Sequence, residues 1–131
     1  MSRENVELAR AAFAAWNAGD MDAFRDAYHP EATMRAPPGW PEPGPFVGRD
    51  AIMRQFEQLR ATYDAEQAEP ISDFEAVADH VVVRYVWRAS GTGPVTNLET
   101  TVVYTMRANA IVAVEYFWDD AEARESAGLT T

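Results

Sequence analysis

The stretch VELARAAFAAWNAGDMDAFRDAYHPEA, residues 6–32, decides the fold. Apolar side chains recur at helical spacing through its first half and give one buried face, formed by Val6, Ala9, Phe13 and Trp16. Gly19 suits the left-handed position that closes a helix, and Asp20 can cap a second, shorter one. Two short helices that fold back before a strand-rich remainder predict a small cone-shaped α+β domain with an internal pocket.

The second helix and the strand after it follow from the same stretch. The inner face of this helix is formed by Phe24, Ala27 and Tyr28. Pro30 cannot continue a helix, and residues 31–36 then alternate between apolar and polar side chains, which predicts a first strand. A third helix begins near Gly48, and its spacing predicts a buried stripe of Ile52, Met53, Phe56, Leu59 and Tyr63.

From residue 65 onward the apolar pattern changes from helical spacing to alternation. Extended segments are expected at 66–77, with an interruption near Pro70, and at 80–89, 96–107 and 111–119. One face of each of the last three is strongly apolar and aromatic. The chain therefore predicts a single α+β domain over residues 1–131, in which a curled mixed or antiparallel sheet wraps around three N-terminal helices and a short helix ends the chain.

The segment 36–46, APPGWPEPGPF, holds five of the eight prolines. Proline has no amide hydrogen, so this segment cannot pair inside a sheet, but it is stiff. Because it also carries Trp40 and Phe46, we interpret it as a lid or rim of the pocket.

Composition excludes several classes of function. The chain carries 21 acidic and 11 basic side chains, a formal net charge of −10, and no basic patch, so binding to nucleic acid or to an anionic membrane surface is not expected. No apolar run approaches the ~18 residues of a membrane span, and no signal pattern opens the chain, which favours the cytoplasm. The absence of cysteine excludes disulfides and thiol catalysis, and two histidines predict no metal site. No cofactor is expected.

Three motifs, Phe13–Asp20 (FAAWNAGD), Tyr28–Ala32 (YHPEA) and Phe46–Ile52 (FVGRDAI), together with the final strand, resemble the SnoaL-like branch of the nuclear transport factor 2-like superfamily. That superfamily also holds ketosteroid isomerase, limonene epoxide hydrolase and scytalone dehydratase. The resemblance covers nearly the whole chain and implies a cone whose concave sheet face and first helices enclose a pocket; many members are dimers. It specifies the fold rather than the function, because this fold hosts unrelated activities.

Carried onto this chain, the resemblance implies a pocket lined by Trp16, Phe56, Leu59, Tyr63, Tyr85, Trp87, Leu98, Thr100, Val114, Tyr116 and Trp118. Arg35 and Pro37 are expected near its rim, with Trp40. The alternation of the strands independently places the same strand residues on one face. The density of tryptophan and tyrosine on that face favours a cavity over a completely filled core.

The catalytic residues of the relatives transfer poorly. The resemblance places the isomerases' general base at Ala36, their oxyanion tyrosine near Ala12 and their second acid near Val102. The acid that hydrolases and cyclases carry on the final strand falls at Tyr116. The usual isomerase residues are therefore absent, and ordinary ketosteroid isomerisation is not expected.

Four side chains are candidates for chemistry, each with a plainer alternative. Tyr116 is either a phenol acid or oxyanion donor, or a core tyrosine. Arg35 either clamps a ligand oxygen or is a surface residue. Asp119 is either a base at the mouth of the pocket or the N-cap of the last helix. His29 is either a proton shuttle or a partner of a helix C-terminus.

The sequence thus predicts binding of a small, largely apolar organic molecule, either with cofactor-independent acid–base chemistry or as a non-catalytic carrier, sensor or dimerisation module. In the enzyme alternative, Arg35 holds a substrate oxygen, Tyr116 donates to it, and water or Asp119 is the base. A homodimer through the outer sheet face is also expected, because that otherwise polar face is interrupted by Val82, Val86, Val103 and Phe117.

Overall fold

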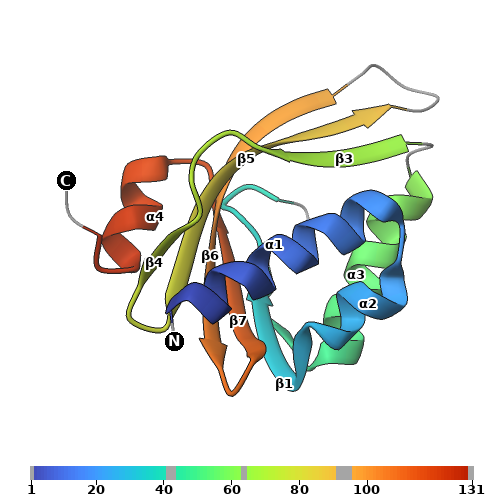
Figure 1. Ribbon diagram of the computed structural model, residues 1–131. Coiled ribbons are helices and arrows are strands. Elements are labelled where there is room, and N and C mark those ends of the chain that lie inside the picture. Colours follow the sequence, from blue (N-terminus) through green and yellow to red (C-terminus); the bar gives the residue numbers. More distant parts are fainter. Residues whose placement is uncertain (1, 41–43, 63–64, 91–95, 130–131) are drawn as a thin grey trace.

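A curved seven-stranded sheet forms the centre of the part of the chain that the computed structural model describes, residues 2–40, 44–62, 65–90 and 96–129 (Figure 1). The strand order is β2-β1-β7-β6-β5-β3, and β4 also pairs with β5. β1 and β7 run parallel, whereas the other neighbours are antiparallel. The strands are β1 (Tyr28–Arg35), β2 (Phe46–Val47), β3 (Ala65–Pro70), β4 (Glu75–Val77), β5 (His80–Ser90), β6 (Thr96–Arg107) and β7 (Ala110–Phe117).

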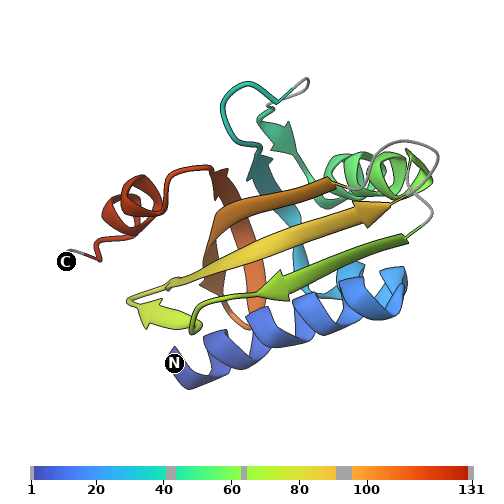
Figure 2. The same ribbon diagram turned by 90° about the horizontal axis from the view of Figure 1, so that it is seen from above.

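Helices cover both faces of this sheet unequally (Figure 2). Three of them pack on the concave face, namely α1 (Ser2–Ala18), α2 (Met21–Asp26) and α3 (Arg49–Thr62), while α4 (Asp120–Ser126) packs on the other. The apolar stripes of the first three join the inner side chains of the sheet in one core. This arrangement confirms the predicted α+β cone. None of the described helices is long and apolar enough to span a membrane.

The boundary between α2 and β1 differs from the sequence prediction. α2 ends at Asp26, so Tyr28 and Pro30 belong to β1 rather than to a helix and its end. The pairing of β1 with β7 is irregular between Tyr28 and Thr33. A proline is tolerated in such a stretch because the ladder does not use its missing amide hydrogen. Tyr28 nevertheless points into the core, where it is 1% exposed.

A β-bulge in β7 also departs from simple alternation. Thr105 pairs with Ala113 and Met106 pairs with Ile111, which leaves Val112 as the extra residue. Ile111 therefore belongs to the main core, whereas alternation predicts Val112 on that face. Beyond the bulge, Val114 and Tyr116 return to the predicted face.

The outer face of the sheet is partly covered by α4. Val82 and Val103 pack with Ala123 and Ala127 of this helix, and Phe117 packs against the same cluster. An ion pair between Arg124 of α4 and Glu75 of β4 adds to this contact between helix and sheet, and both side chains are partly buried. Three of the four apolar residues behind the expected dimer interface thus have partners within the same chain. The homodimer stays a prediction.

The end of α1 is held against the edge strand β3 by Asn17. Its Nδ2 donates a hydrogen bond to the carbonyl oxygen of Ala68 at 2.9 Å, and the Ala68 amide donates to its Oδ1 at 2.7 Å. The Asn17 amide side chain thus occupies the place of a further strand at this edge. On the other side of α1, Arg60 of α3 donates to the Trp16 carbonyl oxygen at 3.1 Å and lies 4.5 Å from the centre of the Trp16 ring. The WNAG segment therefore fixes α1 between β3 and α3.

Replacing Asn17 by alanine should lower the free energy of unfolding by about 2 kcal/mol, because two backbone groups of Ala68 lose their partners. Urea denaturation followed by circular dichroism measures this change. The matched control is Gln58→Ala, which truncates an exposed amide on α3 and should leave the unfolding midpoint almost unchanged. Equal midpoints for Asn17→Ala and wild type would contradict the assigned role of this side chain.

Candidate functional site

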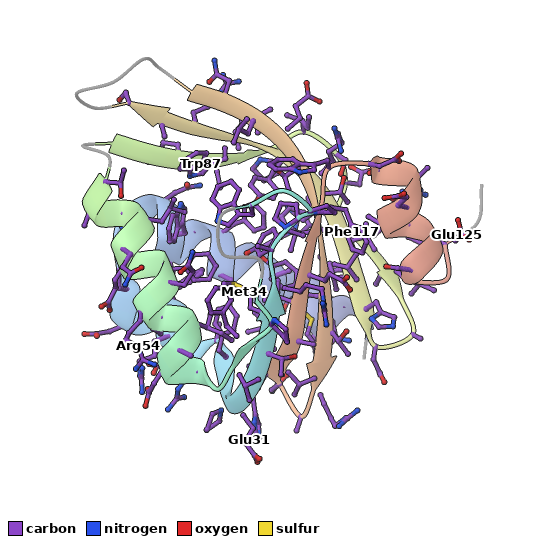
Figure 3. The ribbon with its side chains drawn as sticks, turned by 180° about the vertical axis from the view of Figure 1, so that it is seen from behind. Glu31, Met34, Arg54, Trp87, Phe117 and Glu125 are labelled. Atoms are coloured by element: carbon purple, nitrogen blue, oxygen red, sulfur yellow. The ribbon has the colours of Figure 1, made fainter. Side chains whose placement is uncertain are left out.

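A cavity of about 110 Å³ lies between the concave face of the sheet and the first three helices. Figure 3 labels Met34 and Trp87, which reach this space from β1 and β5. Most of the wall is aromatic and comes from Phe13, Trp16, Phe24, Trp40, Phe56, Tyr85, Trp87, Tyr104, Tyr116 and Trp118. The rest of the lining is formed by Ala12, Met34, Ala36, Pro37, Gln55, Leu59, Ala68, Leu98 and Thr100.

The structure brings most of the predicted pocket residues together on this wall. These are Trp16, Trp40, Phe56, Leu59, Tyr85, Trp87, Leu98, Thr100, Tyr116 and Trp118. Two others lie elsewhere: Val114 is packed in the core at 2% exposure, and Arg35 is exposed to solvent. Arg35 follows Met34 on β1 and therefore faces away from the cavity that Met34 lines, so no contact supports a role for it in holding a substrate oxygen. Tyr63 lies outside the described residues.

Several lining residues were missed by the sequence prediction. Phe13 and Phe24 were placed on buried helix faces without being assigned to the pocket, and Tyr104 of β6 was not among the predicted pocket residues. Gln55 was missed altogether. A signal existed, because Gln55 is three residues after Ile52 and directly precedes Phe56, at the border of the apolar stripe of α3.

The aromatic rings contact one another mainly edge to face. The ring of Phe13 meets that of Tyr85 at 5.4 Å between centroids and that of Tyr104 at 6.4 Å. Trp16 meets Phe24 and Phe56 at 5.4 and 5.3 Å. Such tilted contacts fix the orientation of each ring. The wall is therefore built in advance of any ligand.

Three tyrosines of the lining, Tyr85, Tyr104 and Tyr116, carry hydroxyl groups. A side-chain hydrogen bond joins Tyr85 to Thr100, directly across the β5–β6 pair. No hydrogen bond to another described residue occupies the hydroxyls of Tyr104 and Tyr116. Behind them, the Tyr28 hydroxyl is fully buried and has no partner among the described residues. Open hydroxyls at a cavity wall are available to bind a ligand oxygen.

Burial keeps these tyrosines protonated. It raises the pKa of Tyr28, Tyr85, Tyr104 and Tyr116 above the ordinary value, because the phenolate would lose its hydration. Neighbouring tyrosines raise the pKa of Tyr104 and Tyr116 further, since each phenolate would repel the next. At neutral pH these hydroxyls are therefore hydrogen-bond donors and not bases.

No aspartate, glutamate, histidine, lysine or arginine belongs to the described lining. The positions that the resemblance gives to the isomerase base and oxyanion tyrosine hold Ala36 and Ala12, and both present a methyl group to the cavity. Val102 is fully buried. Within the described residues, no group of three or more potential ligands could hold a metal ion.

Two further candidates have structural roles outside the cavity. The Asp119 carboxylate accepts hydrogen bonds from the amides of Ala121 and Glu122, which makes it the N-cap of α4. The Nδ1 atom of His29 accepts from the Glu31 amide at 3.0 Å, and His29 lies in β1 rather than after a helix. Neither residue lines the cavity.

The mouth of the cavity is closed in part by the segment after β1. The Trp118 indole Nε1 donates a hydrogen bond to the carbonyl oxygen of Pro38 at 2.8 Å. The rings of Trp40 and Trp118 lie 6.3 Å apart at an angle of 45°. Trp118 is 37% exposed although it lines the cavity, so it stands at the boundary with solvent. This contact between Pro38, Trp40 and Trp118 is called the mouth contact below.

Known proteins share this fold. A curated relative, an uncharacterised protein of Mycobacterium tuberculosis, is 25% identical over 123 residues, which cover 93% of this chain and 94% of the relative. Among solved structures, Bal32a from a soil-derived mobile gene cassette superposes with a TM-score of 0.81 at 20% identity, covering 88% of each chain. TerC, which was co-crystallised with polyporic acid, gives a TM-score of 0.78 at 21% identity, covering 93% of this chain and 96% of its own.

A third structure comes from Sinorhizobium meliloti and is proposed to be a polyketide cyclase. It gives a TM-score of 0.71 at 21% identity, covering 84% of this chain and 93% of its own. At such identities these likenesses establish the fold. The family model of the SnoaL-like domain matches residues 9–114, which is most of the chain. The cone, the motifs and this match agree: the chain belongs to the SnoaL-like family.

Proposed function

We propose that this protein binds a small, uncharged, largely aromatic molecule that carries at least one oxygen atom. The observation that carries the proposal is the preformed aromatic cavity, whose polar side-chain groups are neutral hydroxyl, amide and indole groups. A carboxylate or ammonium ion moved into such a wall would lose its hydration without gaining a charged partner. A carbonyl or phenol oxygen needs only a neutral donor or acceptor.

The size of the cavity sets the scale of the affinity. Burying ~200 Å² of ligand apolar surface at about 25 cal/mol per Å² contributes at most ~5 kcal/mol before the entropy cost of association. Apolar contact alone therefore supports weak binding. Tyr104 and Tyr116 are the proposed anchors for a ligand oxygen, because their hydroxyls have no other partner among the described residues.

The same wall favours binding without catalysis over a reaction that begins with abstraction of a proton. A general base must accept a proton near neutral pH, and the raised pKa values of the tyrosines make them poor candidates. What the hydroxyls can do chemically is polarise a carbonyl or stabilise a developing oxyanion. An enzymatic role is therefore the second candidate, with Tyr116 as the electrophilic donor and a base delivered by water or by the substrate.

The relatives support a small-molecule role by analogy. TerC was crystallised with polyporic acid, and the Sinorhizobium meliloti protein is proposed to be a polyketide cyclase. Both names refer to small organic molecules. Because one fold hosts many functions, this support is weaker than that of the cavity itself.

Three probes of nearly equal shape test the proposal. Acetophenone carries a neutral carbonyl, α-methylstyrene replaces that oxygen by a CH₂ group, and benzoate carries a charge. Titration followed by tryptophan fluorescence and calorimetry measures the affinity for each probe. Acetophenone should bind most tightly, α-methylstyrene less tightly and benzoate most weakly. Equal or tighter binding of benzoate, or no binding of any probe, would contradict the proposed function.

Tyr116→Phe should weaken the binding of acetophenone about fivefold to tenfold and leave the binding of α-methylstyrene unchanged. The reason is that the variant removes one hydrogen-bond donor and almost no volume. Calorimetric dissociation constants for the two probes give this comparison directly. Tyr28→Phe is the matched control, since it removes a buried hydroxyl that is not part of the lining. An equal effect of Tyr116→Phe on both probes would mean that its hydroxyl is no anchor.

The response to pH follows from the raised pKa values of the tyrosines. Between about pH 6 and pH 9 the affinity for acetophenone should stay constant, because the lining hydroxyls remain protonated throughout. Above about pH 10 the four buried tyrosines, Tyr28, Tyr85, Tyr104 and Tyr116, ionise in the unfolded chain but not in the folded chain. The free energy of unfolding should therefore fall, by up to about 1.4 kcal/mol per pH unit for each of them. Urea denaturation at several alkaline pH values measures the slope. Tyr28→Phe should reduce it, and an unchanged slope in that variant would refute the linkage.

A further inference from the structure

Trp118 is held from both faces of the sheet at once. On the concave side its indole ring lines the cavity and donates to the Pro38 carbonyl oxygen. Its own backbone carbonyl oxygen accepts a hydrogen bond from Nη1 of Arg84 at 3.2 Å. Arg84 lies in the outer phase of β5, next to the inner residue Tyr85. Trp118 lies between the last residue of β7 and the first residue of α4. Figure 1 shows this short connection between the two elements.

The outer-face contact belongs to a connected cluster. Nη1 of Arg84 also donates to the Thr101 hydroxyl at 2.8 Å, and that hydroxyl donates to Oδ1 of Asp120 at 2.9 Å. Thr101 is fully buried, and Asp120 is the first residue of α4. Arg84 also pairs with Glu99 at 3.5 Å. The cluster therefore holds both ends of the segment between β7 and α4.

We propose that Arg84 is a positioning residue for the mouth of the cavity, acting through the Trp118 carbonyl group to keep the mouth contact closed. Only Trp118 and Asp119 separate the end of β7 from the first residue of α4. A shift of the carbonyl therefore moves the indole ring that donates to Pro38. The cluster then sets the rate at which a ligand enters and leaves, whereas the inner wall sets which ligand binds. The statement about ligand exchange rests on the proposed function; the one about the mouth contact does not.

The chain offers a matched control on the same strand and face. Arg88 lies four residues after Arg84 in the outer phase of β5 and pairs with Glu69 at 2.7 Å and with Asn97 at 3.3 Å. It makes no hydrogen bond to Trp118 among the described contacts. Arg88→Gln therefore removes a similar charge from the same surface without touching the cluster.

The first measurement uses the ligand-free protein. The solvent exchange rate of the Trp118 indole Nε1 hydrogen is followed by ¹⁵N NMR, and its signal is assigned as the one that Trp118→Phe abolishes. Arg84→Gln and Thr101→Val should each raise this rate about fivefold, as expected for the loss of one supporting hydrogen bond, while Arg88→Gln leaves it at the wild-type value. Thermal unfolding establishes that each variant is folded. Because Arg84→Gln and Thr101→Val test the cluster independently, the measurement can still be made if one of them does not fold.

The second measurement is stopped-flow fluorescence with acetophenone. Arg84→Gln should raise both the association and the dissociation rate by a similar factor and leave the dissociation constant nearly unchanged. Trp118→Phe breaks the mouth contact directly. In a protein that carries this change, Arg84→Gln should alter the two rates little further. If wild type does not bind acetophenone, the proposed function fails and the indole exchange still decides the role of Arg84. If indole exchange in both cluster variants equals that of wild type, the positioning role is wrong.

Discussion

The hydrogen bonds between the Asn17 amide and the backbone of Ala68 are the constraint on which the rest of the structure depends. They hold the end of α1 at the open edge of the sheet rather than over its centre. Arg60 of α3 contacts the carbonyl oxygen and the ring of Trp16 in the same helix. Because of these contacts, α1 cannot shift inward to fill the concave face. The rings on that face contact one another at their edges and leave a space between them. A cavity is thus a result of where α1 is fixed.

On the inner face of the sheet, one buried hydroxyl group has no hydrogen-bond partner among the described residues. A buried hydroxyl without a partner costs free energy, and Tyr28 carries one. Retaining tyrosine rather than phenylalanine around the cavity is therefore unfavourable for stability alone. The same choice gives the wall neutral donors that keep their hydrogens across the physiological range. The chemistry of the pocket is decided by burial rather than by charged neighbours.

Much of this could be predicted from the sequence, because helical spacing and alternation report directly on which side chains are buried. Trp16, Phe56, Tyr85 and Tyr116 were placed correctly on the concave side by those patterns. Two of the errors lie where pairing rather than pattern decides. The bulge at Val112 and the strand conformation around Pro30 depend on the partner strand, which the local sequence does not specify. The two-sided anchoring of Trp118 depends on contacts between residues far apart in the chain.

The parallel pairing of β1 with β7 has a consequence for the order of folding. β1 ends at Arg35 and β7 begins only at Ala110, so the sheet cannot be completed until β7 has left the ribosome. Contacts of such large sequence separation form late and slow the reaction, since a long loop must close first. The first three helices and the β5–β6 hairpin can form earlier from local contacts. During synthesis, the aromatic face therefore stays without its last strand longest, and this is the stage at which the nascent chain is most exposed to aggregation.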